Sequence, residues 1–304
     1  MIIAKPRTQP KLLKALTFLD RRTSLAPSDK EMLSNLSKGY EGETIFDQKI
    51  TQYINKEVIV LNDLLLHNRG NSFQIDAMAI TREMIYVYEI KNYQGDYINQ
   101  PDGFTTINGI ELSDPKVQVN KMKNSLSALF QKWKVEKAIE AKVVFIHPEF
   151  TLYHAEVNNP YILPTQVKKN LKKMNNQSEF LLQEDHRLAK RLVEAHQEAV
   201  PYQKQLPEYE WKQLEKGVRC ETCGASNLKI SQRTSYCKNC HEKKTITQLI
   251  LCSIEEYRFL FPKNKLTTKI IYEWCGREVK RERIRNILKT HFTAGRKTNG
   301  QYYF

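Results

Sequence analysis

Two acidic residues and a lysine stand at spacings that could hold a metal ion. Gln74-Ile75-Asp76 and Glu89-Ile90-Lys91 each lie in a segment rich in β-branched and aromatic residues, with twelve residues between Asp76 and Glu89. Strand alternation places Glu89 and Lys91 on one face, and hairpin pairing of the two strands would bring Asp76 to them. Carboxylate oxygens suit Mg²⁺, which polarises a phosphate and activates a water molecule. These residue types are the ones that phosphodiester hydrolysis requires.

Two further polar residues favour such a site over a plainer interpretation. A lone Glu-x-Lys in a strand is usually a solvated pair, since most such charges face water. Here Glu43 follows Gly39-Tyr40-Glu41-Gly42 in the helix before the strands, and Gln118 lies one turn into the helix after them. We therefore treat Glu43, Asp76, Glu89, Lys91 and Gln118 as candidate catalytic residues.

The stretch from about Lys38 to Leu129 resembles the nuclease-related domain (NERD), a branch of the Asp/Glu-x-Lys restriction-endonuclease-like superfamily. The matching positions, in order along the chain, are Gly39, Gly42, Glu43, Gln74, Ile75, Asp76, Glu89, Ile90, Lys91, Asn92, Tyr93, Gly95, Pro115 and Gln118. Taken singly they are weak, but their order and spacing make a fairly specific pattern.

The resemblance implies a mixed β-sheet core, dependence on Mg²⁺ or Mn²⁺, and cleavage of nucleic-acid phosphodiester bonds. It implies that Asp76 and Glu89 are metal ligands and that Lys91 activates the water or stabilises charge. It also implies an auxiliary acid at Glu43 and a positioning group at Gln118.

Four cysteines further along the chain form a pattern typical of structural zinc. Cys220 and Cys223 are separated by thirteen residues from Cys237 and Cys240, giving C-x2-C-x13-C-x2-C. Two such knuckles present four thiolates to one tetrahedral Zn²⁺, and a closed four-thiolate site leaves no position for catalysis. The module resembles a zinc ribbon over about thirty residues. His241 is an alternative ligand that we consider a neighbour, and we expect the isolated Cys252 and Cys275 to be small buried residues.

The last fifty residues are basic and resemble a winged helix-turn-helix. We expect helices over 266–274 and 280–292, and then a β-hairpin that turns at Asn299-Gly300. If this is right, the second helix enters the major groove of DNA and the wing contacts phosphates. The competing interpretation is a solvated helix face. The predicted nucleic-acid contacts are Lys280, Arg281, Arg283, Arg285, Lys289, Arg296 and Lys297.

The elements that must position the candidate site follow from hydrophobic periodicity. A helix, or two broken near Gly39, is predicted over 28–54, with a capping box from Ser28 to Glu31. Three strands over 57–66, 72–81 and 84–93 predict a β-meander, and a hairpin is expected around Asn108-Gly109. Asp114 caps a helix that runs to about Trp133, and 141–146 resumes as a strand. The fold class is therefore α/β or α+β, with a mixed sheet flanked by helices. The resemblance to the nuclease-related domain implies that this sheet is restriction-endonuclease-like.

Three modules are predicted along the chain. They are a nuclease-related domain over 28–200, a zinc ribbon over 215–248, and a winged-helix-like α+β module over 250–304. The helical, charged pattern over 165–197 closes the first, and a proline-bearing linker follows over 201–207. A chain of 304 residues exceeds the usual size of one hydrophobic core.

The charge distribution points to a polyanionic partner. From Lys212 to Phe304 there are 20 basic and 8 acidic residues, which supply +12 of the net charge of +14. Neutralising phosphates releases condensed counterions, so DNA is the expected partner. A membrane partner is not expected, because no stretch approaches the roughly 18 consecutive apolar residues needed to span a bilayer. The N-terminus lacks the apolar core of a signal peptide, and the cysteines indicate a reducing compartment, so we expect a cytoplasmic protein.

The leading hypothesis is a Mg²⁺-dependent endonuclease that acts on DNA. The alternatives are a DNA-binding regulator that retains a nuclease-like domain without cleavage, and an RNA nuclease. A homodimer is compatible with double-strand cleavage because each site cuts one strand. There is no phosphate-binding G-x-x-x-x-G-K-[ST] motif in the sequence, so ATP-driven translocation within this chain is not supported.

Overall fold

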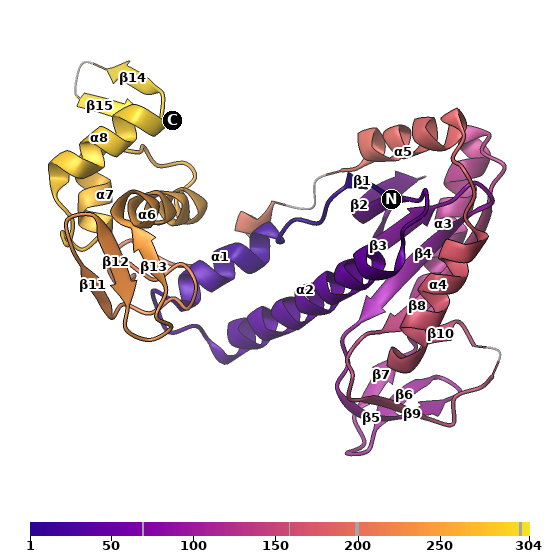
Figure 1. Cartoon of the computed structure of the whole chain (residues 1–304). Coiled ribbons are helices and arrows are strands. Elements are labelled where there is room, and N and C mark those ends of the chain that lie inside the picture. The colour runs from indigo at the N-terminus through magenta and orange to yellow at the C-terminus, as the bar shows by residue number, and fades with distance from the viewer. Residues whose placement is uncertain (69, 158, 198–200, 298–299) are drawn as a thin grey trace. The chain divides into compact units, whose positions relative to one another are not determined.

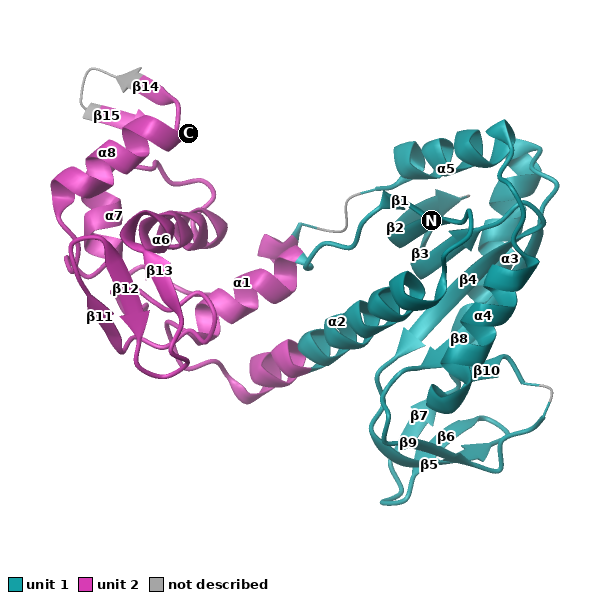
Figure 2. Ribbon diagram, viewed as in Figure 1, with its two compact units in different colours: residues 1–10, 35–201 teal, residues 11–34, 202–304 magenta. Residues whose placement is uncertain are grey.

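The computed structural model describes every residue except 69, 158, 198–200 and 298–299, and describes Arg296 and Lys297 by their backbone alone. The chain forms two compact units. Unit 1 contains residues 1–10 and 35–201, and unit 2 contains residues 11–34 and 202–304 (Figure 2). The division falls at the end of the first unit where the linker was predicted, but residues 11–34 join unit 2. The three modules expected from the sequence stay a prediction.

Unit 1 is built on a six-stranded mixed sheet in the order β1-β2-β3-β4-β8-β10. The strands are β1 (Ile2–Lys5), β2 (Ile59–Asn68), β3 (Asn71–Ile80), β4 (Met84–Lys91), β8 (Ala138–Phe145) and β10 (Tyr161–Ile162). β2, β3 and β4 pair antiparallel, as the predicted meander requires, whereas β8 runs parallel to β4. The predicted mixed α/β fold is confirmed.

Helices cover both faces of this sheet (Figure 1). On one face pack α3 (Pro115–Trp133) and α5 (Gln183–Ala195), through apolar residues such as Val119, Met122 and Leu192. On the other pack α4 (Val167–Gln177) and the unit 1 part of α2 (Pro27–Tyr53), through Phe46, Ile50 and Leu171. The sheet is therefore buried on both sides, which explains why β4 is apolar at most positions.

The helix ends agree only in part with the sequence predictions. Asp114 Oδ1 accepts a hydrogen bond from Lys116 N at 2.7 Å and Pro115 begins α3, as predicted. α2 is one unbroken helix through Gly39, and it begins at Pro27, so Ser28 lies within its first turn. The predicted cap at Ser28 was wrong, because Pro27 already supplies a favourable first helical position.

A second sheet, missed by the sequence analysis, extends from the carboxyl end of β4. Its order is β7-β6-β5-β9, with β5 (Gly95–Gln100), β6 (Gly103–Thr106), β7 (Glu111–Ser113) and β9 (Phe150–Tyr153). The hairpin predicted around Asn108-Gly109 joins β6 to β7. Aromatic side chains fix this sheet to the main core, and Phe145 stacks on Phe150 with ring centroids 4.0 Å apart.

Unit 2 joins a three-stranded antiparallel sheet to a helical bundle. The sheet holds β11 (Leu228–Ile230), β12 (Thr234–Cys237) and β13 (Lys243–Thr245). The helices are α1 (Lys11–Asp20), α6 (Ile246–Leu260), α7 (Thr268–Trp274) and α8 (Arg281–His291), followed by the hairpin of β14 (Ala294–Lys297) and β15 (Gly300–Tyr303). The predicted helix–helix–hairpin order is present, and its proposed turn at Asn299 lies outside the described residues. Among the described residues, no helix is long and apolar enough to cross a membrane.

A buried arginine ties α1 to the rest of unit 2. Arg22 is fully buried and donates hydrogen bonds to both carboxylate oxygens of Glu256 and to the carbonyl of Gly217 at 2.8 Å. Its guanidinium also lies 4.1 Å from the ring centroid of Trp274. These contacts explain why residues 11–34 fold with unit 2.

Removing this guanidinium should destabilise unit 2 strongly. Arg22→Met would leave Glu256 as an uncompensated buried charge, which costs about 3–5 kcal/mol. Urea unfolding followed by tryptophan fluorescence would measure the loss, and Lys14→Met, in the exposed pair with Glu255, should cost less than about 1 kcal/mol. The second change Glu256→Met should recover much of the loss. Equal stability of the Arg22 and Lys14 variants would contradict this account.

Candidate active site

The predicted acidic residues come together where two strands separate. Within the described chain, β3 pairs with β4 from Ala77 to Ile80 and no further, while β4 stays paired with β8 as far as Lys91. Asp76 is the first β3 residue beyond this pairing, and its Oδ2 accepts a hydrogen bond from Ile90 N at 2.8 Å. The Asp76 carboxylate is thus held beside the strand that carries Glu89.

Lys91 connects β4 to α3. Its Nζ donates to Glu89 Oε1 at 2.8 Å and to Gln118 Oε1 at 3.0 Å. The Glu89 side chain is 4% exposed and the Lys91 side chain 19% exposed, so the pair is far more buried than a solvated surface pair. Glu89, Lys91 and Gln118 therefore form one polar cluster, in which Lys91 and Gln118 are 27 positions apart.

The same chain offers a direct comparison with an ordinary Glu-x-Lys pair. Glu140 and Lys142 have the same spacing in the neighbouring strand β8, and their closest charged atoms lie 3.5 Å apart. Their side chains are 35% and 28% exposed. The two pairs therefore differ in side-chain exposure, although both have the same Glu-x-Lys spacing in a strand.

Glu43 reaches the cluster from α2 and is held there by an arginine that the sequence analysis missed. Arg7 Nη1 donates to Glu43 Oε2 at 2.5 Å, Nε donates to Asp47 Oδ2 at 2.8 Å, and Nη2 donates to the carbonyl of Asp76 at 2.8 Å. One buried guanidinium thus connects α2 with the strand that carries Asp76. The planar fork of arginine permits such simultaneous contacts.

The glycine before Glu43 allows α2 to approach the end of β4. A Cβ at Gly42 would lie 2.6 Å from Asn92 Cβ and 3.1 Å from Ile146 Cγ2, distances that leave no room for a side chain. Asn92 Nδ2 in turn donates to the carbonyl of Lys38 at 2.8 Å. Gly42 and Asn92 therefore set the position of Glu43, whereas Gly39 has open space around it.

The carboxylates repel one another electrostatically. Burial raises the pKa of Asp76 well above its ordinary value of 3.8, and the Glu89 and Glu43 carboxylates add to the rise. Burial also raises the pKa of Glu43, against the opposing effect of Arg7. Burial alone would lower the pKa of Lys91, but Glu89, Tyr93 and Asp76 together raise it above its ordinary value. A cation bound between the acids would relieve this repulsion, and their all-oxygen donor set fits Mg²⁺ or Mn²⁺.

The sequence analysis missed Arg7 and Asp47. Arg7 stands 36 residues from Glu43 and 69 from Asp76, so local spacing carried no sign of the contact. Asp47 lies one helical turn after Glu43, and this i, i+4 spacing of two acids on one helix was a usable signal.

Arg7 should act as a positioning residue. Arg7→Lys keeps the positive charge but removes the planar guanidinium group. Glu43 and the Asp76 carbonyl then lose the group that donates hydrogen bonds to both of them. For the metal-dependent DNA nuclease predicted from the sequence, we expect cleavage to slow by about 10–100-fold and the Mn²⁺ concentration for half-maximal cleavage to rise. Arg82→Lys, in the exposed pair with Glu179, is the control. A slower variant with an unchanged Mn²⁺ requirement would indicate that Arg7 is merely structural.

The four predicted zinc ligands gather in unit 2. The sulfur atoms of Cys220, Cys223, Cys237 and Cys240 all lie within 4.8 Å of one another. A backbone N–H of Cys240 lowers the pKa of the Cys237 thiol to about 6, which favours the thiolate form that binds metal. Together with the three short strands between 228 and 245, the cluster is compatible with a zinc ribbon.

The remaining cysteines and His241 lie outside this cluster. Cys275 is fully buried and Cys252 partly buried, in agreement with the sequence prediction for Cys275. His241 Nδ1 is hydrogen-bonded to Tyr236 Oη at 2.6 Å, so its ring is engaged with a neighbour.

The basic residues predicted to contact DNA lie on or beside α8. Lys280, Arg281, Arg285 and Lys289 are exposed, whereas Arg283 is partly buried and donates to the carbonyl of Gln232 in the β11–β12 turn. Arg283 therefore ties α8 to the ribbon. The side chains of Arg296 and Lys297 lie outside the described residues, and their role stays a prediction.

Comparison with known proteins finds a match whose range contains the polar cluster. Residues 38–146 match the family model described as Nuclease-related domain. The matched range contains Glu43, Asp76, Glu89, Lys91 and Gln118. No curated protein and no solved structure matched the chain.

Proposed function

We propose that this chain is a metal-dependent nuclease that hydrolyses DNA phosphodiester bonds, most simply as an endonuclease. The observation that carries the proposal is the convergence of Asp76, Glu89 and Lys91 where β3 and β4 separate, inside a nuclease-related domain. The buried Glu89 carboxylate and the partly buried Asp76 carboxylate beside a lysine constitute the donor set that phosphodiester hydrolysis requires.

Asp76 and Glu89 would hold Mg²⁺ or Mn²⁺. The bound ion supplies Lewis-acid polarisation of the scissile phosphate and a more acidic water. Glu43, held by Arg7, would serve as the auxiliary acid and would add a third carboxylate to the site. Arg7 and the Ile90 N–H hold these acids in place before substrate arrives.

Lys91 would stabilise negative charge rather than remove a proton. The pKa of Lys91 is raised despite burial, in part by the Glu89 carboxylate, so the side chain stays an ammonium group. Two of its three N–H groups are engaged by Glu89 and Gln118, which leaves the third to reach a phosphate oxygen. Gln118 would orient the ammonium group.

The second unit would recruit the DNA. A zinc ion held by Cys220, Cys223, Cys237 and Cys240 would stabilise the ribbon, and the exposed cations of α8 would contact backbone phosphates. The net charge of +12 over 212–304 supports this role. The chain would act in the cytoplasm as a monomer or a homodimer.

Incubation of the purified chain with supercoiled and linear DNA tests the proposal. The reactions contain Mg²⁺, Mn²⁺ or a chelator, and Glu89→Ala runs beside Glu140→Ala, which removes the acid of the ordinary Glu-x-Lys pair. We expect cleavage with either metal, none with the chelator, and loss with Glu89→Ala alone. Cleavage that survives in Glu89→Ala would place the active site elsewhere.

The same assay separates the two alternatives. Binding of DNA without cleavage under every metal condition would favour a non-catalytic regulator. Cleavage of RNA with no cleavage of DNA would favour an RNA nuclease.

A further inference from the structure

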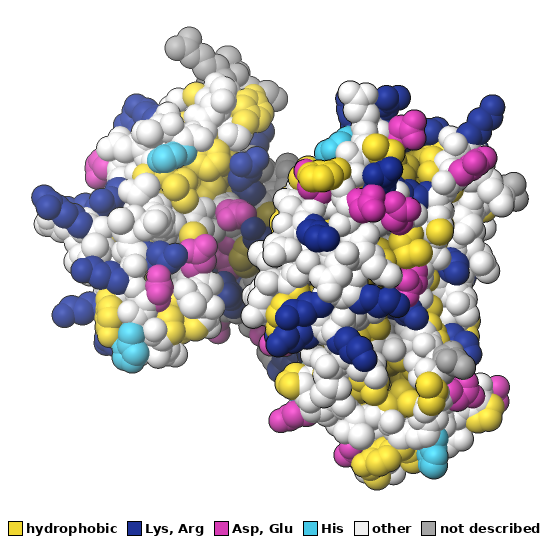
Figure 3. Space-filling view, turned by 45° about the vertical axis from the view of Figure 1, so that its right-hand side comes forward, with side chains coloured by type: hydrophobic (Ala, Val, Ile, Leu, Met, Phe, Trp, Pro, Cys, Tyr) yellow, Lys and Arg dark blue, Asp and Glu magenta, His cyan; other side chains and the backbone are white. Residues whose placement is uncertain are grey.

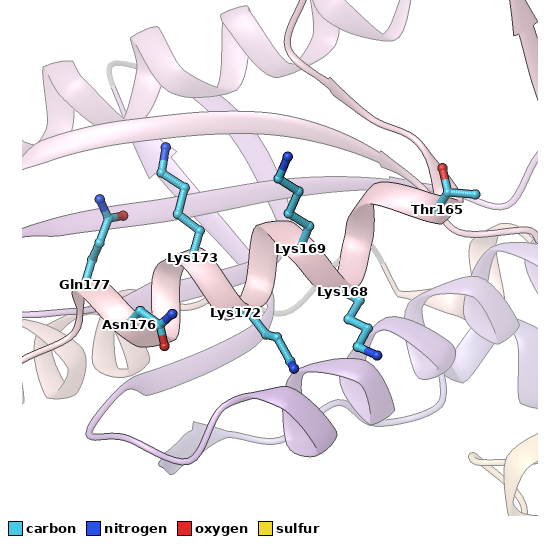
Figure 4. Close-up of a pocket in the computed structure, with 7 residues that line it drawn as sticks. All are labelled: Thr165, Lys168, Lys169, Lys172, Lys173, Asn176 and Gln177. Carbon is cyan, nitrogen blue, oxygen red and sulfur yellow. The ribbon is translucent and has the colours of Figure 1, made fainter.

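Helix α4 presents a row of lysines to solvent in unit 1. Lys169 and Lys173 project from one flank of the helix and Lys168 and Lys172 from the other, with Thr165, Asn176 and Gln177 beside them (Figure 4). These seven exposed residues, here called the α4 lysine face, line a shallow depression of about 550 Å³. Figure 3 shows several Lys and Arg side chains gathered across the middle of the visible face of this unit.

The lysines of this face lack compensating acids. Helix α4 contains no acidic residue, and no ion pair or hydrogen bond to these four ammonium groups occurs among the described residues. Lys168 makes one weaker contact, 5.9 Å above the ring of Tyr53. The rest of the chain before Lys212 is nearly neutral in net charge, so the clustering is local.

This arrangement disfavours the helix that carries it. The pairs Lys168–Lys172 and Lys169–Lys173 are like charges at i, i+4, which repel. Lys168 and Lys169 also lie in the first turn of α4, where the positive end of the helix dipole disfavours cations. Because repulsion among the lysines destabilises α4, a bound polyanion would relieve that repulsion and also add contacts of its own.

The opposite side of α4 is fixed in the core. Val167, Leu171 and Met174 are buried with Tyr88 and Ile90 of β4, on the sheet face away from Glu89. The helix is therefore anchored to the strand that carries the candidate catalytic residues. Its apolar residues are not available for insertion into a lipid surface, which an interfacial membrane helix requires.

We propose that the α4 lysine face binds the phosphate backbone of duplex DNA and so gives unit 1 its own DNA-binding surface. Five helical steps from Lys168 to Lys173 span about 7.5 Å. Each strand of duplex DNA carries one negative charge per about 3.4 Å of its axis, or roughly two phosphates over that length. The four lysines therefore supply enough positive charge to neutralise the stretch of the nearer strand that the face covers. This inference rests on the proposed nuclease function, which supplies DNA as the polyanion.

The test uses the full chain and a short fluorescent DNA duplex, without added Mg²⁺ or Mn²⁺ so that binding is measured without cleavage. The variant carries Lys169→Gln, Lys172→Gln and Lys173→Gln, which spares the Lys168 contact with Tyr53. The matched control carries Lys132→Gln, Arg187→Gln and Lys190→Gln, three exposed cations elsewhere in unit 1. Both proteins lose the same net charge.

We expect the α4 variant to bind about 10-fold or more weakly at low salt, and the control to bind like wild type. The slope of log affinity against log salt should fall by about 2–3, since each phosphate contact contributes about 0.9. An affinity and slope equal to the control would overturn the proposal. Retained DNA binding with lost binding to phosphatidylserine vesicles would overturn it in favour of a lipid surface.

The two proposals can fail separately. If wild type cleaves DNA and the α4 variant matches the control, the nuclease function stands and the α4 surface does not. If wild type cleaves under no metal condition but the α4 variant loses affinity, the surface stands and the nuclease function does not.

Discussion

The Asp76→Asn protein is expected to cleave DNA at least about 10³-fold more slowly than wild type and yet to be more stable without metal. Loss of a ligand removes the charge that would hold the ion, and with it the activation of water and phosphate. The amide that replaces the carboxylate is nearly isosteric with it, so the amide oxygen can keep the bond from Ile90 N. DNA affinity, which is proposed to depend on α4 and unit 2, should stay within about 3-fold.

The gain in stability follows from the pKa of Asp76. Burial, Glu89 and Glu43 raise that pKa in the folded protein above its ordinary value of 3.8. An acid of this kind contributes stability that is present below 3.8 and is lost as the pH rises through the folded pKa. The neutral amide escapes this loss. The difference in melting temperature between variant and wild type should therefore grow from about pH 4 upward.

Thermal melting without added Mg²⁺ or Mn²⁺ over a pH series measures this difference. Each 1 kcal/mol gained corresponds to about 2–4 °C for a unit of this size. Glu140→Gln is the control, because Glu140 is partly exposed in a strand of the same sheet. An Asp76→Asn protein that is inactive and also less stable at every pH would indicate disruption of the fold instead of a missing ligand.

Local patterns predicted the elements that carry the candidate site. The meander over β2, β3 and β4 followed from its β-branched runs, and the start of α3 followed from Asp114 and Pro115. The four cysteines were predicted to converge because their spacing permits few other arrangements. In each case the signal lies within a few residues of the structure it specifies.

Contacts between distant residues were not predictable in this way. Arg22 pairs with Glu256 across 234 positions, and this contact decides that α1 belongs to unit 2. Arg7 likewise reaches Asp76 across 69 positions. By contrast, α6 could have been predicted, since Thr245 and Gln248 form a capping box before a strongly apolar run.

The separation of β3 from β4 explains why Asp76 is firmly held and why the site is also locally destabilised. Paired strands would satisfy their backbone groups with each other, but beyond Ala77 the Asp76 carboxylate takes over the Ile90 N–H. The same step moves Asp76 next to other acids and raises its pKa. Local destabilisation of this kind is common where activity needs charges held close together.

Cys220→Ser is expected to remove zinc from the chain and to unfold much of unit 2 at room temperature. Structural zinc contributes about 10–16 kcal/mol in isolated zinc-finger peptides, far more than a small three-stranded sheet can replace. Cys220 is also buried, at 4% exposure, so its loss opens the core beside the ribbon. Zinc per chain by plasma emission and the melting curve of the purified protein give two independent readouts.

Cys252→Ser is the matched control for this experiment. Cys252 lies outside the four-sulfur cluster, and burial raises the pKa of its thiol to about 12, so it stays a neutral thiol. The control should keep one zinc per chain and its DNA affinity, whereas Cys220→Ser should lose the zinc and the part of the DNA affinity that unit 2 supplies. Under the proposed division of roles, cleavage at high DNA concentration should persist in Cys220→Ser, because Asp76, Glu89 and Lys91 belong to unit 1. Unchanged zinc content in Cys220→Ser would rule out the four-cysteine site, and complete loss of cleavage at saturating DNA would show that unit 2 contributes to catalysis itself.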